Sequence, residues 1–265
     1  MKIMKVSFFV LLTLVVMFLT QGLPIAWAEV RATETVRFIG NFDFPPFAFK
    51  EDSDMVGFEI DLGKAIGRVM GAKVDWVPMS FDPKVYAAAL EKNIADAVLS
   101  SLTITPERRK DFDFTYPYFR TTLAITALNK RKEGATLQFR KRKFEGSRVG
   151  VLKRTTGEDW GRKNLKATLV AYSSAVDMAR DLWEKNLSAI LIDEGVLNFL
   201  VSRYPYDFAI ISRDLDHEEY GIAVKKGNQK LLQELNAALE KIDAAGVYDE
   251  IYNRWFGPRR RLPPH

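Results

Sequence analysis

Two segments of the chain share one residue pattern but end in side chains of different chemistry. Residues 91–101, EKNIADAVLSS, and residues 184–194, EKNLSAILIDE, each begin polar, continue apolar and then stop abruptly. The first stops at the hydroxyls of Ser100 and Ser101, and the second at the carboxylate of Asp193, which a further acid follows. Aligning the shared letters pairs Asp193 with either serine. One tip therefore offers hydroxyl groups, and the other offers a negative charge that can hold a cation.

The stretch after the first tip, residues 100–118 (SSLTITPERRKDFDFTYPY), adds an arginine. Thr105 is a favourable helix N-cap and Pro106 suits the first helical position, so the pattern predicts a helix with Arg108 in its first turn. The planar guanidinium group of arginine matches a carboxylate, and free N–H groups at a helix start also favour an anion. The side chains that we expect around such an anion are Ser101, Thr103 and Arg108.

Both charged residues also have a purely structural interpretation. Arg108 could form an ion pair with Asp111 or Asp113 on the same segment. Asp193 directly precedes a predicted helix that begins at Glu194, and capping a helix is a common role for aspartate. The apolar run before Asp193 nevertheless indicates that it is shielded from water, so its charge needs a cationic partner.

A site with one cation-binding tip and one anion-binding tip fits a zwitterion, and an α-amino acid is the simplest small zwitterion. In this interpretation Phe44, which lies in a loop with prolines, and Phe81 supply apolar walls for the side chain of the ligand. Either aromatic residue could equally belong to an ordinary hydrophobic core. The two tips can act together only if the fold brings segments that are far apart in the sequence to one place.

Strand and helix patterns alternate along the chain, once before residue 100 and again after residue 147. The predicted strands are Val36–Gly40, Lys73–Val77, Ala95–Leu99, Arg148–Leu152, Thr168–Ala171, Ser188–Ile192 and Gly221–Val224. The predicted helices run from Phe58 to Gly71 and over Pro83–Glu91, Thr156–Lys163, Ala175–Lys185, Glu194–Ser202 and Gln229–Ala245, with a last one ending at Trp255. This alternation predicts an α/β fold with two lobes, in which ligands bind outside the carboxyl ends of the strands.

The first 28 residues have the pattern of a secretory signal peptide. Met1–Lys5 is basic, an apolar run follows, and an A-x-A sequence ends at Ala28. We expect cleavage after Ala28, which removes two lysines, lowers the formal net charge from +5 to +3 and places the mature protein in the periplasm. An uncleaved membrane anchor is the alternative.

The composition argues against several classes of function. The net charge is small, so binding to nucleic acid is not expected. The chain has no cysteine, and its two histidines, His217 and His265, lie far apart, so we expect no disulfide, no metal centre and no cofactor. Residues 130–143 carry seven basic side chains and predict a solvated loop or, alternatively, a docking patch. Residues 258–265 predict a frayed tail.

The order of motifs resembles that of one family, the extracellular solute-binding proteins, family 3, which are the periplasmic amino-acid receptors of ABC importers. The resemblance is carried by GNFDFPPFAF, MVGFEIDLGKAIGRVMGAKVDW, ADAVLSSLTITPERRKDFDFTYPY, VGVLKRTTGEDW, LSAILIDE, YGIAVKKGNQKLL and AAGVYDEIYNRWFG, in this order. It covers the mature chain from about residue 35 to residue 257.

The resemblance implies a type II periplasmic-binding-protein fold with two α/β lobes joined by a two-segment hinge. The first lobe is then discontinuous (29–121 and 221–257), the second covers 125–214, and the hinge segments are 122–124 and 215–220. The resemblance also assigns roles to seven residues. Arg108 holds the ligand carboxylate with Thr103 and Ser101, Asp193 and the Ser101 region hold the ammonium, Thr156 touches the carboxylate on closure, and Phe44 and Phe81 flank the side chain. Ser100, beside Ser101 on the same tip, is expected in the ligand site as well.

Two departures from the family pattern affect the expected specificity. Arg154 stands where relatives usually have glycine, and a cation at the edge of the cleft alters closure or favours an acidic ligand. The first loop is shorter than in many relatives, which leaves open whether Asn41 or Asp43 faces the ligand.

The expected function is that of a monomeric receptor that binds an amino acid and delivers it to an ABC transporter permease, without catalysis. The alternative on the same fold is a secreted cyclohexadienyl (prephenate or arogenate) dehydratase, for which Glu158 or Glu194 is the available acid. A sensory module that presents its ligand to a receptor kinase is a third interpretation.

Overall fold

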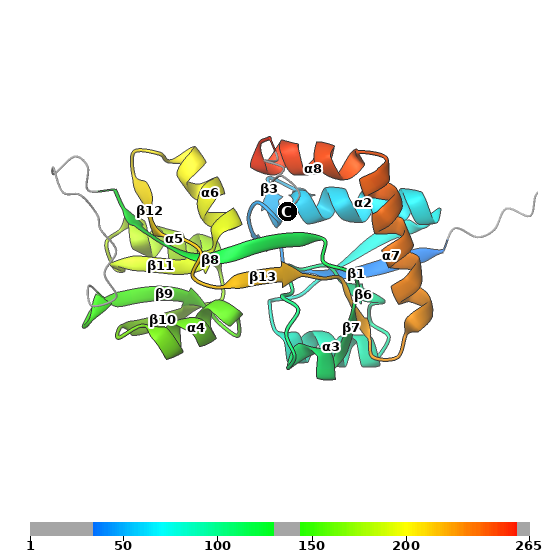
Figure 1. Cartoon of the computed structure of the whole chain (residues 1–265), viewed down its shortest axis with the longest axis horizontal. Coiled ribbons are helices and arrows are strands. Elements are labelled where there is room, and N and C mark those ends of the chain that lie inside the picture. The colour runs from blue at the N-terminus through cyan, green and yellow to red at the C-terminus, as the bar shows by residue number, and fades with distance from the viewer. Residues whose placement is uncertain (1–33, 130–143, 259–265) are drawn as a thin grey trace, which may run out of the picture. The chain divides into compact units, whose positions relative to one another are not determined.

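Strands and helices alternate around two sheets in the computed structural model, which describes residues 34–129 and 144–258 (Figure 1). In the first lobe, β1 (Thr35–Gly40) lies between β5 (Lys73–Pro78) and β6 (Ala97–Val98), and all three strands are parallel. β14 (Ala223–Lys225) pairs antiparallel with both β6 and β7 (Phe112–Phe114). β14, which follows the second lobe in the sequence, therefore lies within a sheet whose other strands all precede that lobe.

The second lobe has its own sheet. β9 (Arg148–Leu152) lies between the parallel strands β10 (Thr168–Tyr172) and β11 (Ala189–Asp193). β8 (Phe119–Leu128) pairs antiparallel with β11 and with β12 (Phe208–Ser212). The α/β class and the two sheet-rich lobes that the alternation predicts are confirmed.

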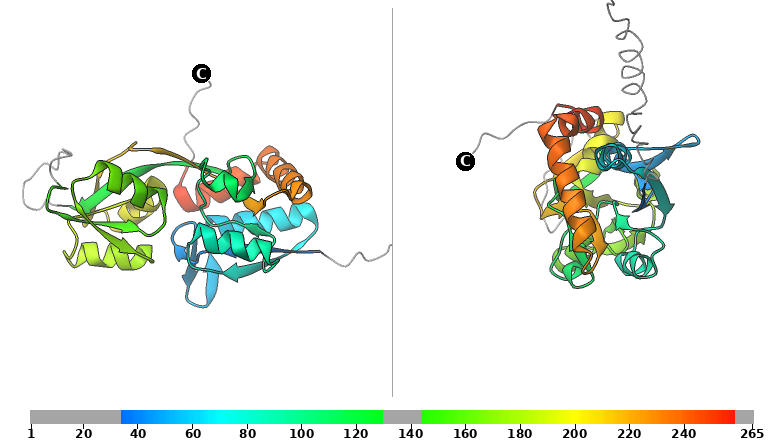
Figure 2. Two further views of the ribbon diagram at one scale, coloured as in Figure 1. Left: turned by 90° about the horizontal axis from the view of Figure 1, so that it is seen from below. Right: turned by 90° about the vertical axis from the view of Figure 1, so that its right-hand side faces the viewer.

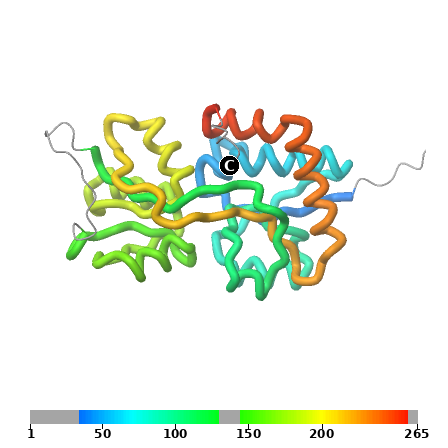
Figure 3. The backbone as a smooth tube through the Cα atoms, viewed as in Figure 1, coloured from blue at the N-terminus to red at the C-terminus, as the bar shows by residue number. Residues whose placement is uncertain are grey.

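The long strand β8 also joins the two lobes. Its first half pairs antiparallel with β13 (His217–Tyr220), from Thr122 opposite His217 to Phe119 opposite Tyr220. Figure 3 shows these two segments running side by side between the lobes. The hinge segments predicted at 122–124 and 215–220 fall within or next to this pair of strands, and the exact domain limits stay a prediction.

Helices cover each sheet. The first lobe has α2 (Phe58–Met70), α3 (Pro83–Glu91), α7 (Gln229–Ala244) and α8 (Val247–Phe256), and the second has α4 (Thr156–Asn164), α5 (Ala175–Trp183) and α6 (Glu194–Arg203). α2 packs against α7 and α8 from the other end of the chain, as both views of Figure 2 show. Among residues 34–129 and 144–258 no helix combines the length and the apolar character that crossing a bilayer requires.

Local signals explain most of these helix limits. α2 buries Phe58, Leu62 and Ile66 on one face and ends at Gly71, whose φ of 66° is the left-handed conformation that glycine adopts at low cost. α3 begins after Asp82, whose side chain accepts a hydrogen bond from Lys84 N at 3.0 Å. These signals act within a few residues, so the sequence pattern predicts them well.

Three sequence predictions are wrong in extent. The helix expected after Thr105 is a single 3-10 turn, η1 (Arg108–Lys110), because the chain enters β7 directly afterwards. The strand expected over Ala95–Leu99 is only β6. The segment Phe42–Phe49, expected to be a proline-broken aromatic loop, forms a hairpin of β2 (Asp43–Phe44) and the start of β3 (Ala48–Glu51), and β3 pairs further with β4 (Asp54–Val56). The predicted signal peptide, the basic loop 130–143 and the tail beyond residue 258 lie outside the described residues.

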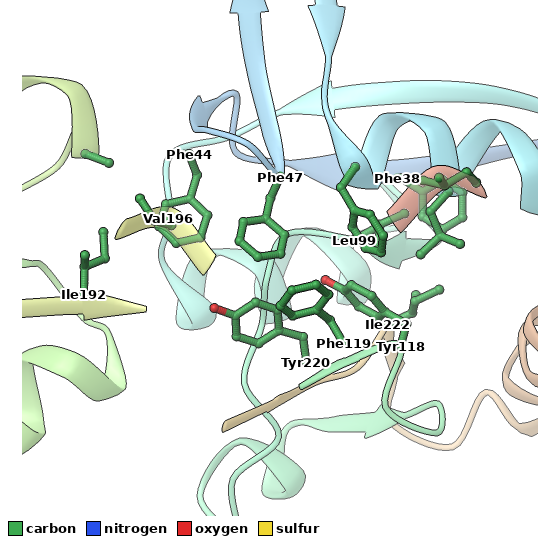
Figure 4. Packing of buried hydrophobic residues seen from close by; sticks show 14 of the residues in the cluster. Phe38, Phe44, Phe47, Leu99, Tyr118, Phe119, Ile192, Val196, Tyr220 and Ile222 are labelled. Atoms are coloured by element: carbon green, nitrogen blue, oxygen red, sulfur yellow. The ribbon is translucent and has the colours of Figure 1, made fainter. Parts of the chain in front are cut away.

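An aromatic cluster packs the hairpin against the hinge strands. The ring of Phe47 stacks on Phe44 at a centroid distance of 5.5 Å and meets Phe119 and Tyr220 edge-on at 4.9 and 5.5 Å (Figure 4). Tyr220 is 1% exposed. Since such rings bury large apolar areas, the cluster holds the Tyr220 hydroxyl in a defined position beside the second lobe.

Candidate functional site

One pocket is lined by side chains from both lobes. All eight residues that the sequence analysis assigned to ligand binding line it: Phe44, Phe81, Ser100, Ser101, Thr103, Arg108, Thr156 and Asp193. The further lining residues are Asn41, Glu59, Ser80, Leu152, Lys153, Arg154, Thr155, Tyr172, Ser173 and Glu218. The fold therefore brings the two tips together, as the carboxyl ends of α/β strands lead one to expect.

A buried acid that the sequence analysis missed holds the first tip in place. Glu59 Oε1 accepts hydrogen bonds from Ser101 N at 2.6 Å, from Ser101 Oγ at 2.8 Å and from the Tyr118 hydroxyl. Burial raises the pKa of Glu59, and the bonds from Tyr118 and Ser101 oppose that rise. Ser100 Oγ in turn accepts from Asn41 N at 3.1 Å. The hydroxyl proton of Ser101 is thus directed to Glu59, so Ser101 presents the pocket with an oxygen acceptor.

Arg108 reaches from the first lobe towards the second. Its side chain is buried, Nη1 donates to the carbonyl oxygen of Thr103 at 2.9 Å, and Nη2 donates to that of Arg154 at 3.5 Å. The guanidinium carbon lies 5.6 Å from the centre of the Phe81 ring. Burial lowers the pKa of Arg108, whereas the negative charges of nearby acids oppose this shift, and an arginine stays protonated under such conditions.

The ion-pair interpretation of Arg108 is wrong. The Asp113 carboxylate instead accepts hydrogen bonds from Lys226 Nζ at 2.7 Å and from Gly227 N at 2.8 Å. None of the ion pairs among residues 34–129 and 144–258 joins Arg108 to Asp113 or to Asp111. Both guanidinium bonds go to main-chain carbonyls, so the positive charge in the pocket has no carboxylate of the described residues bonded to it.

Asp193 occupies the N-cap position of α6 but does not act as its cap. Its side chain makes no capping hydrogen bond and instead accepts a hydrogen bond from the hydroxyl of Tyr220. Burial raises the pKa of Asp193, and the bond from Tyr220 opposes that rise. The helix-cap interpretation is therefore wrong for the side chain, which faces the pocket and the hinge.

Glu218 is a third acid of the pocket, and the sequence analysis missed it too. It lies on β13 and is 4% exposed. Its Oε2 accepts a hydrogen bond from Thr103 Oγ1 at 2.8 Å. Burial, together with the charge of Asp193, raises the pKa of Glu218 to about 8. The period-two alternation of a strand puts Glu218 and Tyr220 on one face, and this signal in the segment HEEY could have identified it.

The second lobe presents a helix start to the pocket. Thr155 caps α4 by accepting from Glu158 N at 3.2 Å, and Thr156 is its first residue. The first N–H groups of a helix lack partners within the helix and carry its positive end, so this position favours an anion. Arg108 faces the same place from the first lobe.

Arg154 forms an ion pair across the pocket rim. Its Nε lies 3.1 Å from Asp82 Oδ2, the cap of α3 in the first lobe. Its φ of 61° is left-handed, a conformation that is unfavourable for a residue with a side chain. Glu158 Oε2 accepts a hydrogen bond from Arg154 N at 2.7 Å and so holds this turn. The cation at the cleft edge therefore links the lobes.

The two residues considered for the ligand side chain lie in different places. Asn41 lines the pocket that both lobes form. Asp43 lines a neighbouring hollow, where burial raises the pKa of its carboxyl group and a hydrogen bond from Ser174 opposes the rise. Asn41 is therefore the better placed of the two residues to meet the side chain of a ligand in the shared pocket.

The charges of the pocket suit a zwitterion. Arg108 and the start of α4 provide a place for a carboxylate, and Asp193 with Glu218 provides a place for an ammonium group. Within the described part of the chain, no group of three or more histidine, cysteine or acidic side chains is arranged to hold a metal ion.

Comparison with protein families decides the relationship of the chain. The model of the bacterial extracellular solute-binding proteins, family 3, matches residues 36–258. The chain belongs to this family. The resemblance inferred from its motifs is thereby confirmed, and solved structures of amino-acid-binding proteins confirm the type II fold.

Several known amino-acid-binding proteins are similar to the chain over most of their length. An L-arginine-binding protein of Pseudomonas aeruginosa is 33% identical over 224 residues, which cover 80% of this chain and 84% of the relative. A solved ancestral arginine-binding protein bound to arginine has a TM-score of 0.76 and 35% identity, with 84% of this chain and 98% of that chain covered. An ancestral amino-acid-binding protein, a precursor of cyclohexadienyl dehydratase, has a TM-score of 0.75 and 30% identity, with 84% and 95% covered.

The family 3 relationship makes the chain a binding protein and not an enzyme, because its relatives are named for the amino acids that they bind. The structure linked to the dehydratase is itself that of an amino-acid-binding protein. The two acids considered for catalysis have other partners. Glu158 pairs with Arg162 and accepts from Arg154 N, and Glu194 pairs with Arg213 and accepts from Thr122 Oγ1.

Proposed function

We propose that this protein, acting as a monomer in the periplasm, captures a free amino acid between its two lobes and delivers it to the permease of an ABC importer. The observation that carries the proposal is the convergence in one pocket of a buried arginine from the first lobe and a shielded aspartate from the second. Arg108 would bind the ligand carboxylate together with the N–H groups at the start of α4. Asp193 would accept from the ligand ammonium group.

Contacts to both lobes also explain how a ligand would close the protein. A ligand shifts a conformational equilibrium only if it binds one state more tightly than the other. An amino acid held by Arg108 and Asp193 at once satisfies this condition, because one residue is on each lobe. Phe44 and Phe81 line the same pocket and would contact the ligand side chain.

Isothermal titration calorimetry against the twenty common amino acids and ornithine tests the proposal. We expect saturable binding of at least one of them with micromolar affinity or better, which corresponds to about −8 kcal/mol. Loss of uptake of the same amino acid in a strain that lacks the protein would support delivery to a permease. If none of the amino acids in this panel binds, the proposal is contradicted.

The ion pair between Arg154 and Asp82 is expected to slow ligand release. Asp82→Asn keeps an α3 cap but removes the charge, and Arg154→Gly removes both the partner and the unfavourable φ. Each variant should accelerate ligand dissociation in stopped-flow fluorescence by up to about fivefold at low salt, since exposed pairs contribute roughly 0.2–1 kcal/mol.

The double variant separates this ion pair from direct contact with the ligand. If the pair acts as a unit, Asp82→Asn with Arg154→Gly accelerates dissociation no more than either single change, and high salt removes the difference from wild type. Arg162→Gln, which breaks a pair within the second lobe, is the control. Additive effects of the two single variants would contradict an ion-pair latch.

A further inference from the structure

One carboxylate oxygen of the pocket lacks a donor. Glu218 Oε1 is buried and no donor among the described residues meets hydrogen-bond geometry to it, although Oε2 of the same group is bonded to Thr103. The Thr156 hydroxyl and the Asp193 carboxyl group lie close enough to the Glu218 carboxyl group to affect its pKa. A buried acceptor without a partner costs about 1–3 kcal/mol, so native proteins retain few of them. Because this oxygen belongs to a residue that lines the pocket, the missing donor points to a ligand.

The groups around Glu218 come from four separate segments. Thr103 follows the first tip, Thr156 begins α4, Asp193 ends β11, and Arg108 lies in η1. Tyr220, on the same strand, donates to Asp193. Glu59, the other buried acid of the pocket, is bonded to Ser101 and Tyr118 instead. Asp193 is thus the acid that faces Glu218, and Arg108 is the cation near both.

Two carboxyl groups that face each other behave as one unit. They form a hydrogen bond with each other only when one of them is protonated, because two carboxylates are acceptors that repel. Burial and the charge of Asp193 raise the pKa of Glu218 to about 8, and burial also raises the pKa of Asp193, so in the empty pocket the pair holds one proton near neutral pH. An ammonium group between them would supply donors to both and would favour the charged form.

We propose that Glu218 is a second acceptor for the α-ammonium group of the ligand, and that the proton which it shares with Asp193 in the empty pocket is released when the ligand binds. This inference rests on the proposed function, since it needs an amino acid in the pocket. It assigns the α-ammonium to a pair of acids, one on β11 and one on the hinge strand β13. The hinge strand β13 then contacts the ligand directly through Glu218.

Proton release is measured by titrating L-arginine and L-glutamine into the protein in buffers of different ionisation enthalpy at pH 7, with the tightest binder of the amino-acid panel replacing them if neither binds. We expect about half a proton or more to leave per ligand bound. Affinity should rise by about ten- to a hundredfold between pH 5.5 and pH 8.5, because the charged acceptor strengthens the bond. An analogue of glutamine without the α-ammonium, glutaramic acid, should release no proton.

Glu218→Gln provides the matched variant, because it keeps the shape and the bond to Thr103 but cannot titrate. Its affinity should equal that of the wild type near pH 5.5, fall at least about tenfold below it near pH 8.5, and be accompanied by no proton release. Glu219→Gln, the same change on the opposite face of β13, should leave both readouts unchanged.

Thermal unfolding without ligand gives a readout that is independent of binding. A carboxyl group whose pKa is higher in the folded than in the unfolded state loses stabilisation as the pH rises from the unfolded pKa towards the folded one. The thermal midpoint of wild type should therefore fall, relative to that of Glu218→Gln, between pH 5 and pH 8.5.

Amino-acid binding that is independent of pH and releases no proton would overturn this proposal and leave the proposed function standing. Retention of proton release in Glu218→Gln would overturn it as well. Absence of binding by every amino acid would overturn both. If Glu218→Gln does not fold, proton release by glutamine but not by glutaramic acid in the wild type still supports it, and equal release by the two contradicts it.

Discussion

Replacing Arg108 by methionine is expected to weaken amino-acid binding by about 10²–10⁴-fold. Two hydrogen bonds from a guanidinium group to a carboxylate contribute roughly 1.5–3 kcal/mol each, and each 1.4 kcal/mol corresponds to about a factor of ten in affinity. Methionine fills the buried volume beside Phe81 without supplying a donor. Calorimetric titration with the amino acid that wild type binds measures the loss.

Arg109→Met is the matched control for this change. Arg109 is the next residue of the same 3-10 turn, and its guanidinium lies over the ring of Phe114, 5.9 Å from the centroid, on the exposed side. The control should bind with the affinity of wild type. Unchanged affinity in Arg108→Met, with the protein still folded, would contradict the assignment of the ligand carboxylate to Arg108.

Replacing Asp193 by asparagine is expected to weaken binding by roughly ten- to a hundredfold, because it removes the charge that faces the ligand ammonium but keeps the shape. The protein itself should remain stable. The side chain makes no capping bond to α6, and the oxygen of asparagine can still accept from Tyr220. Titration calorimetry and thermal unfolding of the same preparation measure the two effects.

Glu194→Gln is the control for Asp193→Asn, since Glu194 begins the same helix but pairs with Arg213 instead of lining the shared pocket. It should leave affinity unchanged. A loss of unfolding free energy in Asp193→Asn as large as its loss of binding free energy would identify Asp193 as a structural residue. It would then be removed from the proposed ligand site.

Signals that act over a few residues made much of the fold predictable. Asp82 followed by Pro83 marks the start of α3, and Gly71 marks the end of α2, so both helices were expected within a residue of their limits. The same signals failed after Thr105. A favourable cap was present, but the strand pairing of Phe112–Phe114 with β14 left room for only one turn.

The hydrogen-bond partners of the buried acids were not predictable because they are distant in the sequence. Glu59 is bonded to Ser101, 42 residues away, and Glu218 is bonded to Thr103, 115 residues away. In the sequence each of them resembles an ordinary surface acid at a helix start or in a polar strand. Glu59 and Glu218 are buried only because the hinge strands and α2 pack around the first tip.

The sequence alone determined the chemical character of the two tips, hydroxyls with an arginine on one and a carboxylate on the other, because residue type and strand end are local properties. The tertiary structure decided how those groups are used. In the folded protein the Ser101 hydroxyl donates to Glu59, the Asp193 side chain does not cap α6, and Glu218 lies beside Asp193. The protonation of the pocket acids, and the hydrogen-bonding groups that remain for a ligand, depend on which donors the two lobes bring close to them. No local sequence pattern contains that information.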